Sequence, residues 1–186
     1  MRLTDSHSLS DPESRMMRWV ERVVVGERLC PFAQPSIARG GFEVKVSEAT
    51  DLESAYHALL AYLADFVQPA SAHLDSGLLV FSDALSDFDE YLDCLAAGEE
   101  ALEHLELSGV IQLASFHPQY LFEGSPPEDH AHWTNRAPLP AFHLLRESAV
   151  SDAVDLVRDP DKIPERNIAH LRQLSADELR ALFADL

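Results

Sequence analysis

Positive charge is almost missing from the middle of this 186-residue chain. No Lys or Arg occurs between Val46 and Asn135, where 17 residues are Asp or Glu. The formal net charge is −18, and the rest of the chain, which holds all 14 basic residues, is close to neutral. An acidic surface repels phosphate backbones, so the sequence disfavours nucleic-acid binding. We also expect any Arg beside a pocket to have a specific partner.

Cysteines and long apolar runs are scarce as well. The two cysteines, Cys30 and Cys94, are far apart and lack CxxC spacing, which argues against a four-cysteine zinc site and a dithiol redox centre. No stretch approaches the roughly 18 consecutive apolar residues of a membrane helix. The N-terminus has no secretory signal. We therefore expect a cytoplasmic protein with no membrane partner, in which both thiols stay reduced.

The hydrophobic pattern predicts alternating helices and strands. Strands are expected at 42–46, 77–81 and 109–114. Helices are expected at 10–28, 50–66, 86–105 and 140–156, with two more after Pro164 and Ser175. Clean alternation at 42–46 indicates an edge strand with one face toward water.

This order predicts a single α/β domain over residues 10–186, preceded by a disordered tail at 1–9. We expect a sheet of three or four strands with helices packed on it. A ferredoxin-like α+β arrangement is the alternative, and a strand near Tyr120–Phe122 would favour it.

An irregular segment runs from His117 to Pro140 and is much longer than ordinary loops of roughly four to six residues. His117 follows a strand that we expect to be central, and ligands bind at the carboxyl edge of open α/β sheets. Pro118 restricts the backbone, which would aim the imidazole of His117 and the hydroxyl of Tyr120. An imidazole suits a general acid or base. The alternative is a histidine that holds the loop in shape through backbone hydrogen bonds.

The following segment concentrates polar groups. Asn135 and Arg136 come just before two prolines and the expected helix. On a helix, His143, Arg146 and Glu147 would share one face, because they are spaced i, i+3 and i+4. The two arginines could grip a carboxylate or phosphate bidentately, with Glu147 orienting His143 or pairing with Arg146. The alternative is a solvated stripe whose ion pair contributes less than roughly 1 kcal/mol.

Cys30 is a candidate nucleophile or pocket wall. A thiol becomes reactive beside a cation, a His or a helix N-terminus, and Arg28 and Arg39 are near in sequence. A buried structural cysteine is the alternative, and we interpret Cys94 as structural.

Four histidines fall within 27 residues, at positions 117, 130, 132 and 143, so a divalent metal site is a further hypothesis. Their spacing matches no standard metalloenzyme motif, so we assign no metal ligand and leave the cofactor open. A phosphate loop, a GxGxxG fingerprint and a GxSxG elbow are also lacking, which argues against the common nucleotide-binding and serine-hydrolase classes.

Four motifs in the same order resemble one family. They are LCPFA at 29–33, SFHPQY at 115–120, TNRAPLP at 134–140 and HLLRE at 143–147, and IPERN at 163–167 also fits. The family is the uncharacterised bacterial and plant group named domain-of-unknown-function family 1415, and the resemblance extends roughly from Trp19 to Leu174. It implies a stand-alone bacterial domain and brings no established activity. Members that resemble this chain tend not to carry the pair His130 and His132, which weakens a mechanism built on it.

These observations favour a small-molecule enzyme that acts on a carboxylate or phosphate. The residues expected in its site are His117, His143, Glu147 and Cys30 for catalysis and Arg136, Arg146, Asn135 and Tyr120 for substrate binding. A non-catalytic module that binds a metabolite or a protein is the first alternative, and a metal-binding protein is the second. The oligomeric state stays open. The enzyme hypothesis requires three separated stretches of the chain to meet in one hollow.

Overall fold

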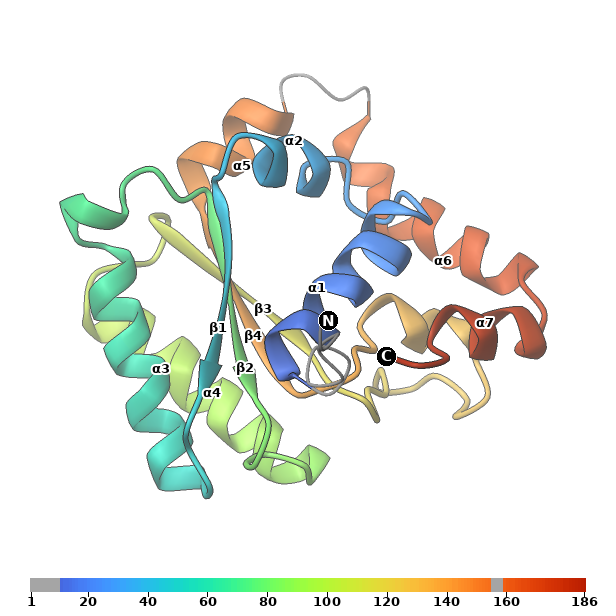
Figure 1. Ribbon diagram of the computed structural model, residues 1–186, viewed down its shortest axis with the longest axis horizontal. Helices are drawn as coiled ribbons and strands as arrows, with labels where there is room; N and C mark the ends of the chain where they lie inside the picture. The colour runs from blue at the N-terminus through green and yellow to red at the C-terminus, as the bar shows by residue number, and fades with distance from the viewer. Residues whose placement is uncertain (1–10, 155–158) are drawn as a thin grey trace, which may run out of the picture.

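A computed structural model describes residues 11–154 and 159–186, so the tail expected at 1–9 lies outside the described residues. One sheet holds four strands, which are β1 (Phe42–Ser47), β2 (Ser76–Phe81), β3 (Ile111–Phe116) and β4 (Ala141–Arg146). Their order is β1-β2-β4-β3 (Figure 1). β1 is parallel to β2, and β4 is antiparallel to both β2 and β3. Three strands therefore share one direction, with β4 reversed between β2 and β3. The α/β class is confirmed, with four strands.

Seven α-helices lie in the described part of the chain. They are α1 (Pro12–Trp19), α2 (Ala33–Ala38), α3 (Leu52–Phe66), α4 (Phe88–His104), α5 (Glu147–Val154), α6 (Ile163–Gln173) and α7 (Ala176–Leu182). A π-helical segment, Val20–Val25, continues α1, and 3-10 turns occur at Pro69–Ser71, His130–Thr134 and Pro160–Lys162. None of the described helices is both long and apolar enough to cross a membrane.

Local chemistry fixes several helix ends. The Asp11 carboxylate accepts a hydrogen bond from the Ser14 N–H and caps α1. Asp51 and Ser54 form a reciprocal capping box at α3, and Ser175 and Glu178 form another at α7. These contacts satisfy backbone N–H groups that have no partner inside the helix.

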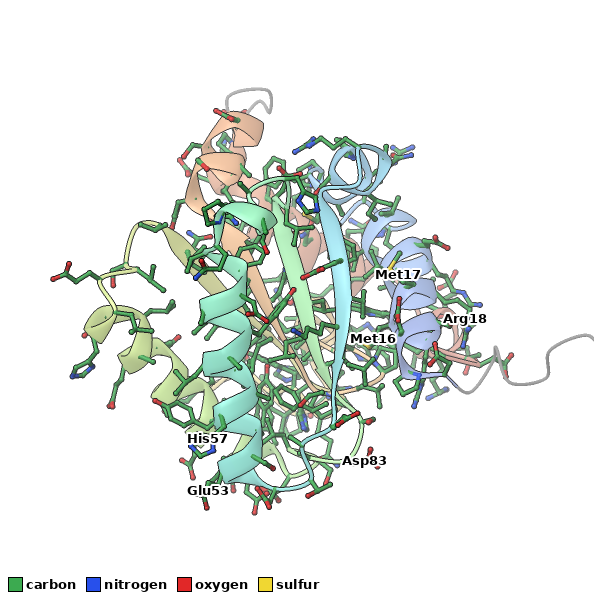
Figure 2. The ribbon with its side chains drawn as sticks, turned by 60° about the vertical axis from the view of Figure 1, so that its left-hand side comes forward. Met16, Met17, Arg18, Glu53, His57 and Asp83 are labelled. Atoms are coloured by element: carbon green, nitrogen blue, oxygen red, sulfur yellow. The ribbon has the colours of Figure 1, made fainter. Side chains whose placement is uncertain are left out.

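The sheet is covered on both sides (Figure 1). We call the side under α3 and α4 the α3 face, and the side under α1, α6 and α7 the α1 face. Leu79, Phe81, Phe142 and Leu144 belong to the core with α3 and α4. Leu78, Val80 and Ala141 belong to the core with α1, to which Met16 and Trp19 contribute. In Figure 2, Met16 lies on the side of α1 toward the sheet and Arg18 on the side away from it.

The prediction of a helix at 140–156 is wrong for the first half of that range. Residues Ala141–Arg146 form β4, and the helix begins only at Glu147. A short run of apolar residues is compatible with a helix as well as with a buried strand. Here the run forms a strand, because β4 is central in the sheet and needs apolar side chains on both faces. Because β4 takes the place between β2 and β3, β3 lies at an edge of the sheet and not at its centre. The residues Tyr120–Phe122 form no strand, so the ferredoxin-like alternative has no support.

Candidate functional site

Several of the residues predicted from sequence lie at opposite ends of the sheet. In the β3–β4 pairing, Phe116 lies opposite Ala141 and Ile111 lies opposite Arg146. The stretch after Phe116 therefore lies at one end, and Arg146 with Glu147 lies at the other. A six-residue strand spans roughly 16–20 Å. The expectation that all the predicted residues line one hollow is wrong, because a small ligand does not contact both ends.

His117 is fully buried and both of its ring nitrogens contact the backbone. Nδ1 accepts a hydrogen bond from the Gln119 N–H at 3.1 Å, so the proton is assigned to Nε2, which lies 3.0 Å from the Leu85 carbonyl oxygen. The rings of Phe88 and Tyr91 lie 5.0 and 4.9 Å from the imidazole. Burial lowers the pKa of His117. This geometry matches the loop-holding alternative.

The segments around His117 and Arg136 do come together, as the sequence suggested. The His117 N–H donates to the Asn135 carbonyl at 3.1 Å, and Asn135 Nδ2 donates to the Ser115 carbonyl at 3.0 Å. The hydroxyls of Tyr120 and Ser115 are 3.2 Å apart. Asn135 and Tyr120 are thus occupied in joining the two segments.

Arg136 is less constrained than its neighbours. Its Nε donates to the Tyr120 carbonyl at 3.3 Å, and its guanidinium lies 4.9 Å from the centre of the Trp133 ring. The Trp133 ring in turn packs edge-on against Phe183. Burial lowers the pKa of Arg136. The guanidinium makes no ion pair with any described residue, so Arg136 remains a candidate for anion binding.

Arg146 is occupied at the other end of the sheet. Its Nε donates to the Leu74 carbonyl at 2.7 Å, and its Nη2 donates to the carbonyls of Ser71 and Phe66. Its guanidinium also stacks 4.6 Å from the centre of the Phe66 ring. These contacts tie β4 to the C-terminal end of α3 and to the turn that follows. The guanidinium of Arg146 therefore stabilises the fold through its contacts with these backbone carbonyls.

Glu147 begins α5, and its backbone N–H donates to the Val110 carbonyl at 3.0 Å. Within residues 11–154 and 159–186 its carboxylate contacts neither His143 nor Arg146 through a hydrogen bond or an ion pair. His143 and Arg146 point to opposite faces of β4, because their spacing of three places them on alternate sides of a strand, and Glu147 lies beyond the end of the strand in α5.

His143 lies in the middle of β4 and points to the α1 face, where it pairs in register with Leu78 and Ala114. The rings of Phe42 and Phe116 each lie 6.2 Å from the imidazole. Its Nε2 is enclosed and has no hydrogen-bond partner among the described residues. Burial lowers the pKa of His143 to about 4, so the ring is neutral at pH 7.

Two residues of α1, which the sequence did not single out, also have an enclosed nitrogen without a hydrogen-bond partner among the described residues. Trp19 is 2% exposed, and its ring packs edge-on at 5.1 Å against Phe116. Neither Trp19 Nε1 nor Arg15 Nε has a hydrogen-bond partner in the part of the chain that the structure describes. We refer to Arg15, Trp19, Phe116 and His143 as the Phe116 cluster.

Helix periodicity explains how α1 presents these groups. Arg15 and Trp19 are spaced i and i+4 on α1, so they share one side of the helix. That side faces the sheet at Trp19, which packs against Phe116, and Arg22 in the π-helical segment contacts the C-terminal segment, where its Nη1 donates to the Ala184 carbonyl at 2.7 Å. The spacing of two arginines around a tryptophan is the sequence signal that could have identified them. The π-helical segment begins directly after Trp19, and such segments are frequent at functional sites.

Cys30 lies between the π-helical segment and α2. Burial raises the pKa of its thiol, although the N–H groups of Phe32 and Ala33 act in the opposite direction. Of the two arginines expected beside it, Arg39 pairs with Asp75 at 2.6 Å. At neutral pH Cys30 is therefore a thiol and not an activated thiolate. Cys94 is buried, and its burial raises its pKa to about 11.

The loop histidines do not converge. His130 Nδ1 lies 3.3 Å from the Leu171 carbonyl oxygen. His132 accepts a hydrogen bond from the Phe122 N–H at Nδ1, and its Nε2 lies 2.8 Å from the Pro126 carbonyl oxygen. Over the described ranges, no three side chains of His, Cys, Asp or Glu gather closely enough to hold a metal ion. The hypothesis of a loop metal site has no geometric support.

A family model described as "Protein of unknown function (DUF1415)" matches residues 11–181. The chain belongs to this family. The match confirms the resemblance that the four motifs indicated. No curated protein and no solved structure matches the sequence. Because the description of the DUF1415 family names no activity, a function has to be inferred from the geometry of the Phe116 cluster and its surroundings.

Proposed function

We propose that the protein is a small-molecule enzyme that acts on an organic anion bound at the Phe116 cluster. The observation that carries this proposal is the set of enclosed nitrogens at Arg15, Trp19 and His143, which lack hydrogen-bond partners among the described residues. Leaving such a group buried and unsatisfied costs about 1–3 kcal/mol, and native proteins contain few of them. Three on facing elements therefore favour a ligand that satisfies them.

Charge supports an anion. Most of the surface of a chain with net charge −18 repels anions, whereas α1 brings the guanidinium of Arg15 to this side of the sheet. Arg136 offers a second guanidinium at the same end of the sheet as Phe116, because its Nε donates to the Tyr120 carbonyl and the neighbouring Asn135 pairs with His117. Arg146 takes no part in the proposal, since three carbonyls hold it.

His143 is the residue that we propose to exchange a proton with the bound compound. Its ring is neutral at pH 7, so Nε2 can accept a proton from a ligand or donate its own hydrogen. His117 is a weaker choice, because both of its nitrogens already contact backbone groups. Glu147 and Cys30 have no role in this proposal.

A second candidate is a module that binds a metabolite without converting it. The observation that favours it is the commitment of His117, Asn135 and Arg146 to backbone contacts, which leaves few polar groups for chemistry. A bound anion that is recovered unchanged after long incubation with the protein would select this candidate. For either candidate we propose a cytoplasmic protein without a nucleic-acid partner, in line with the acidic composition.

The test is native mass spectrometry of the purified protein incubated with a mixture of small carboxylates and phosphates. We expect the parent to retain at least one anion, and Arg15→Gln to bind it at least tenfold more weakly. Arg180→Gln is the matched control, because Arg180 pairs only with Asp177 on the surface within the described structure. Binding that is equal in all three proteins, or retention of no anion by the parent, would contradict the proposal. Conversion by the parent, and none by His143→Asn at anion concentrations that saturate the variant, would assign the proton transfer.

A further inference from the structure

The surroundings of His143 restrict the kind of anion that fits. On the α1 face its neighbours in register are Leu78 and Ala114. The rings of Phe42 and Phe116 stand on either side at 6.2 Å. All four neighbours are hydrocarbon, so a molecule that reaches Nε2 has its body against apolar side chains. Apolar surroundings of this kind suit ligands whose bodies are apolar and whose few polar atoms fix the orientation.

The charged groups nearby argue against a phosphate. A phosphate is commonly held by the free N–H groups at a helix N-terminus. At α1 the Asp11 carboxylate already accepts the Ser14 N–H at 2.9 Å, and Glu13 adds a second negative charge in the first turn. A dianion would be repelled there. A group with one negative charge suits the guanidinium of Arg15 together with two neutral donors.

The two neutral donors fit a carboxylate. The Trp19 N–H is a donor only, and a neutral imidazole has one N–H. The centres of the Trp19 and His143 rings lie 5.1 and 6.2 Å from that of the Phe116 ring, Trp19 approaching from α1 and His143 from the neighbouring strand β4. A carboxylate has two acceptor oxygens, so one group can take a hydrogen bond from each donor.

We infer, resting on the proposed function, that the ligand is a monocarboxylate with an aromatic or branched apolar body. Its oxygens accept hydrogen bonds from Trp19 Nε1 and His143 Nε2, and its body lies against Phe42 and Phe116. Solvent does not reach either nitrogen, so α1 has to move from the sheet when the ligand enters. The π-helical segment Val20–Val25 joins α1 to the rest of the chain at that point.

Tryptophan fluorescence of the full chain can test this inference, because the chain has only two tryptophans. In a Trp133→Phe background, Trp19 is the sole reporter. The probes are benzoate and 4-methylpentanoate, compared with inorganic phosphate and glycerol 3-phosphate at equal concentration and ionic strength. We expect both carboxylates to change the Trp19 emission and to raise the melting temperature, and both phosphates to do neither.

Variants then locate the binding. His143→Asn is expected to weaken carboxylate binding at least tenfold, whereas His57→Asn, on the exposed side of α3 (Figure 2), leaves it unchanged. If His143→Asn does not fold, Trp19→Phe removes the other donor, and calorimetry replaces fluorescence, with at least a fivefold loss expected. If His143→Asn folds, or Trp19→Phe folds in its place, and binds the carboxylates as tightly as the parent, the inference is wrong.

The outcomes separate the two proposals. If phosphates bind in an Arg15-dependent manner and the carboxylates do not, the proposed function stands and the monocarboxylate inference is wrong. If none of the four probes binds, the monocarboxylate inference is wrong, and the wider mixture used in mass spectrometry decides the proposed function.

Discussion

The Nε2 atom of His117 lies 3.0 Å from the carbonyl oxygen of Leu85, and this contact joins the loop after β3 to the loop after β2. Leu85 has a positive φ of 58°, a conformation that is uncommon for a residue with a side chain. The Gln119 N–H completes the arrangement by donating to His117 Nδ1. At the carboxyl end of the sheet, the neutral imidazole of His117 therefore holds two loops together through its hydrogen bonds.

Replacing His117 by Ala is expected to destabilise the fold. The change leaves the Leu85 carbonyl and the Gln119 N–H without partners and opens a space between Phe88 and Tyr91. Together these effects cost about 3 kcal/mol in the free energy of unfolding. Urea denaturation measures it, with His57→Ala as the control. A loss below about 1 kcal/mol would show that His117 is not a structural connector.

Stability is expected to fall between pH 6.5 and pH 4 because of His143. Its pKa is about 4 in the folded protein and near 6.5 when unfolded, so the unfolded chain binds more protons in this window. The stabilising contribution is fully present above pH 6.5 and is lost as the pH falls through the folded pKa. Its size is about 3 kcal/mol. Urea unfolding at several pH values without added anion measures it. His143→Asn should flatten the dependence, and an identical slope in parent and variant would contradict this assignment.

Much of the architecture follows from local signals in the sequence. The alternation at 42–46 placed β1 at an edge of the sheet, where it lies, and the strand expected at 77–81 is β2. The start of α7 after Ser175 was also visible, because the Ser175 hydroxyl accepts a hydrogen bond from the nearby Glu178 N–H. Such local signals involve residues only a few positions apart, so they can be recognised in the sequence without knowing which distant residues pack together.

β4 and the site depend on contacts between distant residues. The apolar residues of Ala141–Arg146 satisfy either a buried strand or a helix, and only the gap between β2 and β3 decides between them. That error placed His143, Arg146 and Glu147 on one face, whereas the strand separates them. The role of Trp19 was hidden for the same reason, because its unsatisfied N–H is evident only when Phe116 packs against it.

Arg146→Lys is expected to cost about 3 kcal/mol, although the charge is conserved. An ammonium cannot reproduce the planar fork that serves the carbonyls of Leu74, Ser71 and Phe66. Thermal or urea unfolding measures the loss. Arg180→Lys, at an exposed pair, is the matched control and should change stability by less than about 0.5 kcal/mol. Equal effects of the two substitutions would show that the Arg146 contacts do not stabilise the fold.

Both cysteines are expected to react slowly in the folded protein. Burial raises the pKa of Cys30 and of Cys94, so neither is a thiolate at neutral pH. Iodoacetamide at pH 7.5, followed by mass spectrometry, should modify the native protein more slowly than a free model thiol and the urea-unfolded protein at the model rate. Native Cys30 that reacts faster than the model thiol would restore it as a candidate nucleophile.

The central claim is that the enclosed nitrogens of the Phe116 cluster serve a bound anion. Two-dimensional ¹H–¹⁵N NMR observes the indole N–H of Trp19 directly, and its signal is identified by its loss in Trp19→Phe. During titration with benzoate we expect this signal to shift downfield to saturation as the N–H gains an acceptor, while the Trp133 indole signal moves little. A Trp19 signal that stays in place with benzoate, and with every anion that mass spectrometry finds bound, would contradict the account.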